Sequence, residues 1–121
     1  MRYLRKWLKT ANSKNSKMLR IGVNGMGRIG RLFTRAALQN PEYGKSFEIV
    51  AFNDLTDPKT IAFLLKYDSV HGKLNRRIEV TEDGIRIDGY EMRGYSIPDP
   101  AQIPWHERDV DLVIESTGRF R

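Results

Sequence analysis

The chain has 121 residues, a formal net charge of +6 and no cysteine. This length suits one domain, and the lack of cysteine excludes disulfides, thiolate metal sites and cysteine nucleophiles within the chain. Six of the 21 basic residues lie in 1–17, which has no acidic residue, whereas 18–121 holds 15 basic and 15 acidic residues. The body therefore offers no basic groove for nucleic acid, and no apolar run is long enough for a membrane span.

Residues 1–17 form a basic leader that differs in composition from the rest of the chain. Within it Leu4 and Leu8 recur at the spacing of an amphipathic helix. Three interpretations stay open: a start codon placed upstream of Met18, an organellar transit peptide, and a segment that lies on a membrane surface. We therefore divide the chain into a leader, 1–17, and a body, 18–121, and expect a cytoplasmic protein, with organellar targeting by the leader as the alternative.

The first half of the body alternates strands with helices. Short β-prone runs at 19–24 and 47–53 predict buried strands. Helices are predicted over 29–39 and over 58–67, where Asp57 is placed to cap the first turn. This βαβα order predicts a parallel sheet. The apolar residues of the first helix recur at helical spacing and are expected to form its buried face: Ile29, Leu32, Phe33, Ala36 and Ala37.

The second half changes character. Alternation of apolar and charged residues at 78–80 and 85–87, on either side of Glu-Asp-Gly, predicts an antiparallel hairpin. A proline-bearing loop is expected over 95–102, and a further strand over 111–116. The predicted fold class is α/β: a partial Rossmann-type dinucleotide-binding fold with a parallel βαβ core and an antiparallel hairpin insertion.

A glycine-rich turn joins the first strand to the first helix. Gly25 would allow the tight turn, Gly27 would let the backbone approach a pyrophosphate, and Gly30 would let the helix pack closely. The free N–H groups near Arg28 and Ile29, together with the helix dipole, would face the phosphates. The alternative is a glycine-rich turn that binds no ligand, because a lone match of this kind is a weak signal.

An acidic residue follows the second predicted strand, as a dinucleotide site requires. Asp54 lies 24 residues after Gly30, where its carboxylate could accept hydrogen bonds from the adenosine ribose and repel a 2′-phosphate. No basic residue stands beside it, since Leu55 and Thr56 follow, so NAD is favoured over NADP. Asp54 could instead serve only a turn or a helix entry. Asn24 is expected to serve the glycine turn.

Four sequence blocks in this order resemble the N-terminal, NAD-binding portion of phosphorylating glyceraldehyde-3-phosphate dehydrogenase of the bacterial type. The resemblance covers 19–121 and excludes the leader. The blocks are Ile-Gly-Val-Asn-Gly-Met-Gly-Arg-Ile-Gly-Arg at 21–31, Asn-Asp-Leu-Thr-Asp at 53–57, Lys-Tyr-Asp-Ser-Val-His-Gly-Lys at 66–73 and Glu-Ser-Thr-Gly at 115–118.

The resemblance implies a glycolytic oxidoreductase that uses NAD and assembles as a homotetramer. It also implies that Arg28 and Ile29 contact the pyrophosphate and that Asp54 holds the adenosine ribose. Thr117 and Gly118 would line the cofactor cleft. Pro98 stands where the family has an arginine beside the adenine; proline keeps a backbone carbonyl acceptor there but lacks the side chain.

The largest departure from the family is the missing catalytic group. The resemblance implies a cysteine that attacks the aldehyde, and the chain contains none. We expect a truncated fragment that is inactive alone, poorly soluble or only partly folded, and weak in NAD binding. Two alternatives stay open: a stand-alone NAD-binding or interaction module without enzyme activity, and a fragment of the related erythrose-4-phosphate dehydrogenase.

Overall fold

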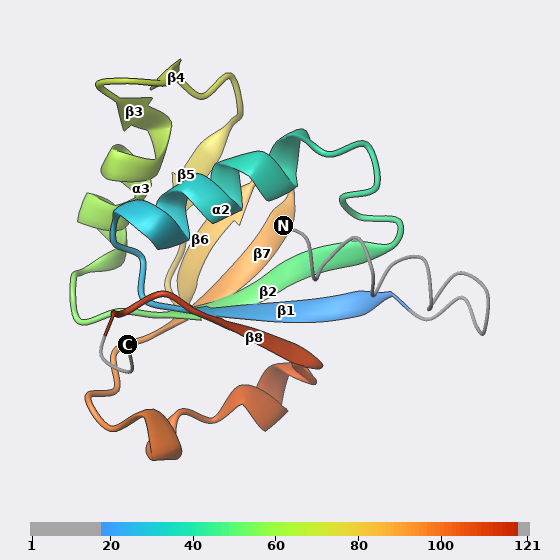
Figure 1. The fold of residues 1–121 in the computed structure, drawn as a ribbon, viewed down its shortest axis with the longest axis vertical. Helices are drawn as coiled ribbons and strands as arrows, with labels where there is room; N and C mark the ends of the chain where they lie inside the picture. Colours follow the sequence, from blue (N-terminus) through green and yellow to red (C-terminus); the bar gives the residue numbers. More distant parts are fainter. Residues whose placement is uncertain (1–17, 119–121) are drawn as a thin grey trace.

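A six-stranded mixed sheet forms the centre of the molecule, and the computed structural model describes residues 18–118. Helices α2 and α3 lie on one side of the sheet, and two short 3₁₀ segments, η1 and η2, lie on the other (Figure 1). The strand order is β5-β6-β7-β2-β1-β8, with a separate two-stranded ribbon β3-β4. The elements are β1 Leu19–Asn24, α2 Arg28–Gln39, β2 Phe47–Asn53, α3 Pro58–Lys66, β3 Tyr67–Asp68, β4 Gly72–Lys73, β5 Ile78–Val80, β6 Gly84–Ile87, β7 Tyr90–Tyr95, η1 Pro100–Gln102, η2 Trp105–Arg108 and β8 Leu112–Glu115.

The predicted parallel core is confirmed. Strand β1 pairs in parallel with β2 on one side and with β8 on the other, and β2 pairs in parallel with β7. Because the four strands run in the same direction, their carboxyl ends meet at one edge of the sheet. There Asn24 is opposite both Asn53 and Glu115, and Asn53 is opposite Tyr95.

The predicted hairpin is also confirmed, but it extends further than the sequence indicated. Strands β5 and β6 pair antiparallel, and β6 then pairs antiparallel with β7. Strand β7 was not predicted from the sequence. Its charged residues and Gly94 give a weak strand pattern, and pairing with β6 on one side and β2 on the other stabilises it. The hairpin therefore continues the main sheet through β7.

The predicted buried face of α2 is only partly confirmed: Ala37 is buried and Phe33 packs against the core, but Ile29 and Ala36 are exposed. The helix buries Gly30, Thr34, Arg35, Ala37 and Leu38, whereas the Ile29 side chain is 54% exposed. Ala36 is exposed as well, and Leu32 and Phe33 are only half-buried.

Two polar residues on the buried face of α2 have hydrogen-bond partners within the protein. The Thr34 hydroxyl donates to the Gly30 carbonyl within the helix. The Arg35 guanidinium donates to the carbonyls of Leu65 and Gly72, at 2.8 and 2.7 Å, and so covers the carboxyl end of α3. An arginine whose guanidinium N–H groups are hydrogen-bonded can thus lie in the interior.

The core has two parts, one on each face of the sheet. The larger part lies beneath α2 and α3, and Asp57 caps α3 as predicted by accepting from the Thr60 N–H at 2.8 Å. The smaller part packs Ala51 and Tyr95 against η2. A Cβ at Gly22 would lie 2.7 Å from the Trp105 ring, so this side of β1 has room only for glycine. Within the described part of the chain, no helix is long and apolar enough to cross a membrane.

Candidate functional site

A cleft of about 430 Å³ opens at the carboxyl ends of the parallel strands. It lies between the glycine turn, the end of β2, the segment after β7 and the residues after β8. This is where an open parallel sheet usually binds its ligand. The lining residues are Asn24, Gly25, Gly27, Asn53, Asp54, Leu55, Ile97, Pro98, Pro100, Ile103, Ser116 and Thr117.

A different physical reason applies to glycine at each of the three positions of the turn. Gly25 has a φ of +99°, which side-chain-bearing residues rarely adopt, and its N–H donates to the Asn53 carbonyl at 2.8 Å. A Cβ on Gly30 would lie 2.0 Å from the Gly25 carbonyl oxygen, so Gly30 allows α2 to pack against the turn. A Cβ on Gly27 would have no atom within 4 Å from the described residues, apart from those next to it in the chain. The protein itself therefore gives no packing reason for glycine at this position.

The amino end of α2 faces the cleft without a capping side chain. Gly27 is its N-cap residue, no side chain accepts from the first turn, and that turn of the described helix carries no acidic residue. The N–H groups of the first helical residues have no helical acceptor. With the positive end of the helix dipole, they form a ready site for an anion. The side chains of Arg28 and Ile29 are exposed at this end.

Asp54 is both a turn residue and part of the cleft. One carboxylate oxygen accepts from the Met26 N–H at 2.6 Å, and the other accepts from the Thr56 N–H at 2.8 Å. The two backbone donors hold the carboxylate in place beside the glycine turn. Since each oxygen has further lone pairs, the same carboxylate can accept from a ligand.

Asn24 has a different role from the one expected. Its side chain does not serve the glycine turn but lies across the ends of neighbouring strands. It donates to the Glu115 carboxylate at 2.9 Å and accepts from the Asn53 amide at 3.1 Å. The turn is held by Asp54, by Ser116, which donates to the Gly25 carbonyl, and by the backbone carbonyl of Asn53. Tertiary pairing places Asn53 and Glu115 on either side of Asn24.

Six of the predicted site residues line the cleft, namely Asn24, Gly25, Gly27, Asp54, Pro98 and Thr117. Arg28 and Ile29 begin the helix at its mouth, and Gly30 lies beneath the turn. Gly118, the last residue described, is not among the lining residues. All ten stay predictions as ligand contacts.

Six further lining residues were missed by the sequence analysis: Asn53, Leu55, Ile97, Pro100, Ile103 and Ser116. Five of them lie within two residues of a predicted site residue, so proximity at a strand end was an available signal. Ile103 had no such signal. It reaches the cleft because the segment after β7 folds back along the sheet.

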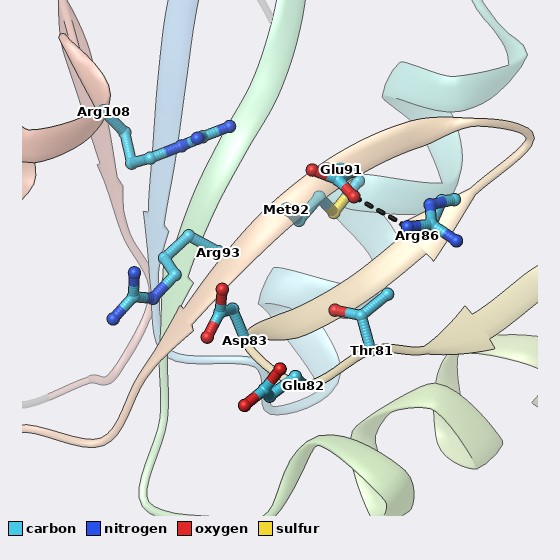
Figure 2. Close-up of a pocket in the computed structure, with 8 residues that line it drawn as sticks. All are labelled: Thr81, Glu82, Asp83, Arg86, Glu91, Met92, Arg93 and Arg108. Carbon is cyan, nitrogen blue, oxygen red and sulfur yellow. Dashed lines mark hydrogen bonds and ion pairs between the residues drawn. The ribbon is translucent and has the colours of Figure 1, made fainter.

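A second hollow, of about 260 Å³, lies on the hairpin (Figure 2). Arg86 donates to Glu91 at 2.8 Å, and this bond holds the pKa of the Glu91 carboxyl below its ordinary value. The buried Arg93 Nε has no hydrogen-bond partner among the described residues. Arg93 lies 5.1 Å from the centre of the Tyr95 ring. No helix begins at this hollow, and no glycine turn lies among its lining residues. It has none of the features that prepare the first cleft for an anion.

Comparison with known proteins gives one consistent result. Residues 19–121 match the family described as glyceraldehyde 3-phosphate dehydrogenase, NAD binding domain. Glyceraldehyde-3-phosphate dehydrogenase 1 of Bacillus cereus is 53% identical over 103 residues, covering 85% of this chain and 30% of the relative. The enzyme of Thermotoga maritima is 51% identical over 106 residues, covering 86% and 31%. That of Mycoplasma pneumoniae is 49% identical over 105 residues, covering 87% and 30%.

The chain therefore spans roughly a third of the length of these curated relatives. The matched part includes the glycine turn, Asp54 and the strand that ends in Glu115. The fold and the matched family agree with the sequence prediction of an NAD site. The chain belongs to the glyceraldehyde-3-phosphate dehydrogenase family and carries its NAD-binding domain over residues 19–121.

Proposed function

We propose that the cleft binds NAD through the adenosine diphosphate half of the cofactor. The observation that carries this proposal is Gly27. A Cβ there would meet nothing within the protein, yet the position lies at the uncapped amino end of α2. A glycine without a packing reason, at the end of a helix that attracts anions, suits the close approach of a pyrophosphate.

The pyrophosphate lies at the start of α2 in this proposal. The backbone N–H groups of Arg28 and Ile29 donate to it, and both side chains are exposed and leave that approach open. Backbone donors need no reordering when the ligand arrives, because the helix already fixes them. Gly30 supports the arrangement from beneath by bringing the helix against the Gly25 carbonyl.

The adenosine ribose lies against Asp54. Its carboxylate is already fixed by the N–H groups of Met26 and Thr56, so a ribose hydroxyl meets an oriented acceptor. A 2′-phosphate at the same place would meet a negative charge. This accounts for a preference for NAD over NADP.

The adenine lies beyond the ribose, between apolar side chains. Leu55 is 65% exposed at one side of the cleft, and Ile97, Pro98 and Pro100 form the other side. Pro98 offers its carbonyl as an acceptor. Thr117 closes the cleft on the side of β8, and Gly118 follows it in the chain.

We further propose that the domain serves the oxidation of a phosphorylated aldehyde in glycolysis, in a homotetrameric, cytoplasmic enzyme. NAD would supply the hydride acceptor for that step. The chain contains no cysteine to attack the aldehyde. We therefore expect the 121 residues alone not to oxidise the aldehyde, and we also expect them to bind the cofactor weakly.

The test is a titration of the 121-residue chain, followed by NMR of its backbone amides. NAD and AMP, added to millimolar concentration, are expected to shift the amides of Gly27, Arg28 and Asp54, and NADP is expected to bind more weakly than NAD. Absence of these shifts at millimolar NAD would overturn the proposal.

Two variants at neighbouring acidic residues locate the ribose contact. Asp54→Asn keeps an acceptor for the Met26 N–H but loses the charge, and it should weaken NAD binding about tenfold and reduce the discrimination against NADP. The matched control is Asp57→Asn, because asparagine also caps helices and Asp57 does not line the cleft. Equal losses in both variants would contradict the assignment.

A further inference from the structure

A continuous row of side-chain hydrogen bonds crosses the ends of the parallel strands beneath the cleft. The Ile97 N–H donates to Asn53 Oδ1 at 2.8 Å, and Asn53 Nδ2 donates to Asn24 Oδ1 at 3.1 Å. Asn24 Nδ2 donates to Glu115 Oε2 at 2.9 Å. The row ends where Glu115 Oε1 accepts from the Thr117 N–H at 3.1 Å and from its hydroxyl at 2.6 Å.

The direction of every bond in this row is fixed by chemistry. A backbone N–H can only donate, so Asn53 must turn its oxygen to Ile97 and its NH₂ group to Asn24. Asn24 must then present its own oxygen to Asn53 and its NH₂ group to Glu115. An ionised carboxylate can accept this bond together with those from Thr117. Reversing one amide would place two donors or two acceptors face to face.

The Asn53 side chain also extends the pairing of β2 with β7. The ladder ends at Asn53 and Tyr95, after which the Asp54 N–H donates to the Tyr95 carbonyl. Beyond this point the Asn53 amide both accepts from the Ile97 N–H and donates to the Ile97 carbonyl, at 2.8 and 3.1 Å. The next residue, Pro98, has no N–H to donate. The side of the cleft that Ile97 and Pro98 form is thus held in place through the Asn53 side chain.

The two central members of the row are buried. Asn24 is 4% exposed and Asn53 is 6% exposed, so water cannot readily replace a lost partner. Buried polar networks of this kind lose more when one member is removed than a single exposed hydrogen bond would. Glu115 and Thr117, at one end of the row, are exposed, so the two buried amides connect an exposed end to the Ile97 end.

We propose that Asn53, Asn24 and Glu115 act as positioning residues that couple the two walls of the cleft. Glu115 and Thr117 stand at one wall and Ile97 and Pro98 at the other, on the adenosine side. Glu115 thereby controls adenosine binding without lying on the adenosine side itself. This inference rests on the proposed function of the cleft.

The experiment uses the whole 121-residue chain with AMP and NAD as probes. In Glu115→Gln the carboxamide cannot accept from Asn24 and from both Thr117 donors, so AMP binding should weaken about tenfold. The Ile97 amide resonance should also move in the protein without ligand. The matched control is Asp111→Asn, an equal loss of charge beside the opposite end of β8, which should leave AMP binding and Ile97 unchanged.

A double-mutant cycle separates coupling from general damage. Asn24→Ala breaks the row in the middle, so adding Glu115→Gln to it should cause less than about a twofold further loss of AMP binding. If Asn24→Ala does not fold, Asn53→Ala replaces it in the cycle. Phe52→Leu, a change in the core beside Asn53, shows how far reduced stability alone affects binding.

The outcomes distinguish the two proposals. If the unmodified chain does not bind AMP or NAD, the proposed function fails, and this inference fails with it. If the unmodified chain binds both probes but Glu115→Gln leaves AMP binding and Ile97 unchanged, only the coupling is overturned. Full additivity in the cycle would overturn it as well.

Discussion

Two hollows of this domain differ in how their polar groups are arranged. The hollow on the hairpin is lined by arginines and carboxylates, of which Arg86 and Glu91 pair with each other, as Figure 2 shows. The cleft at the ends of the parallel strands has few charged side chains. Its polar character comes from Asp54, from the amino end of α2 and from uncharged polar side chains such as Asn24, Asn53 and Thr117.

The difference follows from strand direction. Antiparallel neighbours satisfy one another along their whole length, so the hairpin leaves few backbone donors for a ligand. Parallel strands end together at one edge, and the connections that follow them begin there. At that edge a helix terminus leaves N–H groups without partners. The topology, rather than the number of charges, therefore prepares the cleft for an anionic ligand.

The largest effect is expected when a Cβ is added beneath the turn. In Gly30→Ala the new Cβ would lie 2.0 Å from the Gly25 carbonyl oxygen, a backbone atom that cannot move alone. We expect a loss of about 3 kcal/mol in the free energy of unfolding, measured by urea denaturation, and loss of NAD binding.

Gly84→Ala is the corresponding change in the hairpin. Its Cβ would lie 2.1 Å from the Met92 carbonyl oxygen, so it should destabilise the protein to a similar degree. The folded fraction should still bind NAD, because the clash lies in the hairpin. If Gly84→Ala removed binding from the folded protein, the two hollows would not be independent.

A smaller and more selective effect is expected at Gly27. Alanine at this position meets no atom within 4 Å and has an ordinary backbone conformation with a φ of −72°. The free energy of unfolding should fall by less than about 1 kcal/mol, the cost of alanine at a helix N-cap. NAD binding should weaken at least about tenfold by NMR titration, because the Cβ occupies the place proposed for the pyrophosphate.

The opposite result at Gly27 is equally informative. Unchanged NAD binding in Gly27→Ala, with stability preserved, would mean that the pyrophosphate does not approach this position. Comparison with Gly30→Ala then separates the two roles of glycine in one turn. One glycine leaves room for the protein backbone, and the other leaves room for the ligand.

The smallest effect is expected from the charged pair of the hairpin. Arg86 lowers the pKa of Glu91 from its ordinary value of 4.5, chiefly through their hydrogen bond. A carboxyl whose pKa is lower in the folded protein stabilises it above the ordinary pKa, and this contribution is lost as the pH falls through the folded value. Urea denaturation near neutral pH should show Glu91→Gln to be slightly less stable than the unmodified protein.

Acidification should make the two proteins converge, since protonation removes the same interaction from the unmodified chain. A difference that persisted well below the ordinary pKa would show that Glu91 acts through packing instead. Glu91→Gln should not alter NAD binding at neutral pH, because the pair lies outside the cleft.

Several features of this domain could be predicted from local sequence. The glycine spacing, the position of Asp54 and the β-prone runs predicted the parallel core and the edge at which the cleft lies. The position of Asp57 before Pro58 predicted that Asp57 caps the amino end of α3. These signals are local, because a tight turn, a cap or a short apolar strand depends on residues that are close in the chain.

Other features depended on contacts between distant residues. Strand β7 forms because β6 and β2 both pair with it, although its own residues give a weak pattern. The burial of Arg35 on α2 was not predicted, and it depends on the carbonyls of Leu65 and Gly72, which accept from its guanidinium. Apolar periodicity cannot reveal partners that lie 30 or more residues away.

The sequence by itself determined where a dinucleotide could bind, because glycine conformations and a strand-end carboxylate follow from the residue types. Only the tertiary structure decided how the walls of that cleft are held. The row from Ile97 through Asn53 and Asn24 to Glu115 joins residues 29 to 91 positions apart in the chain. Parallel pairing brings them to one edge, where their hydrogen-bonding groups complement one another.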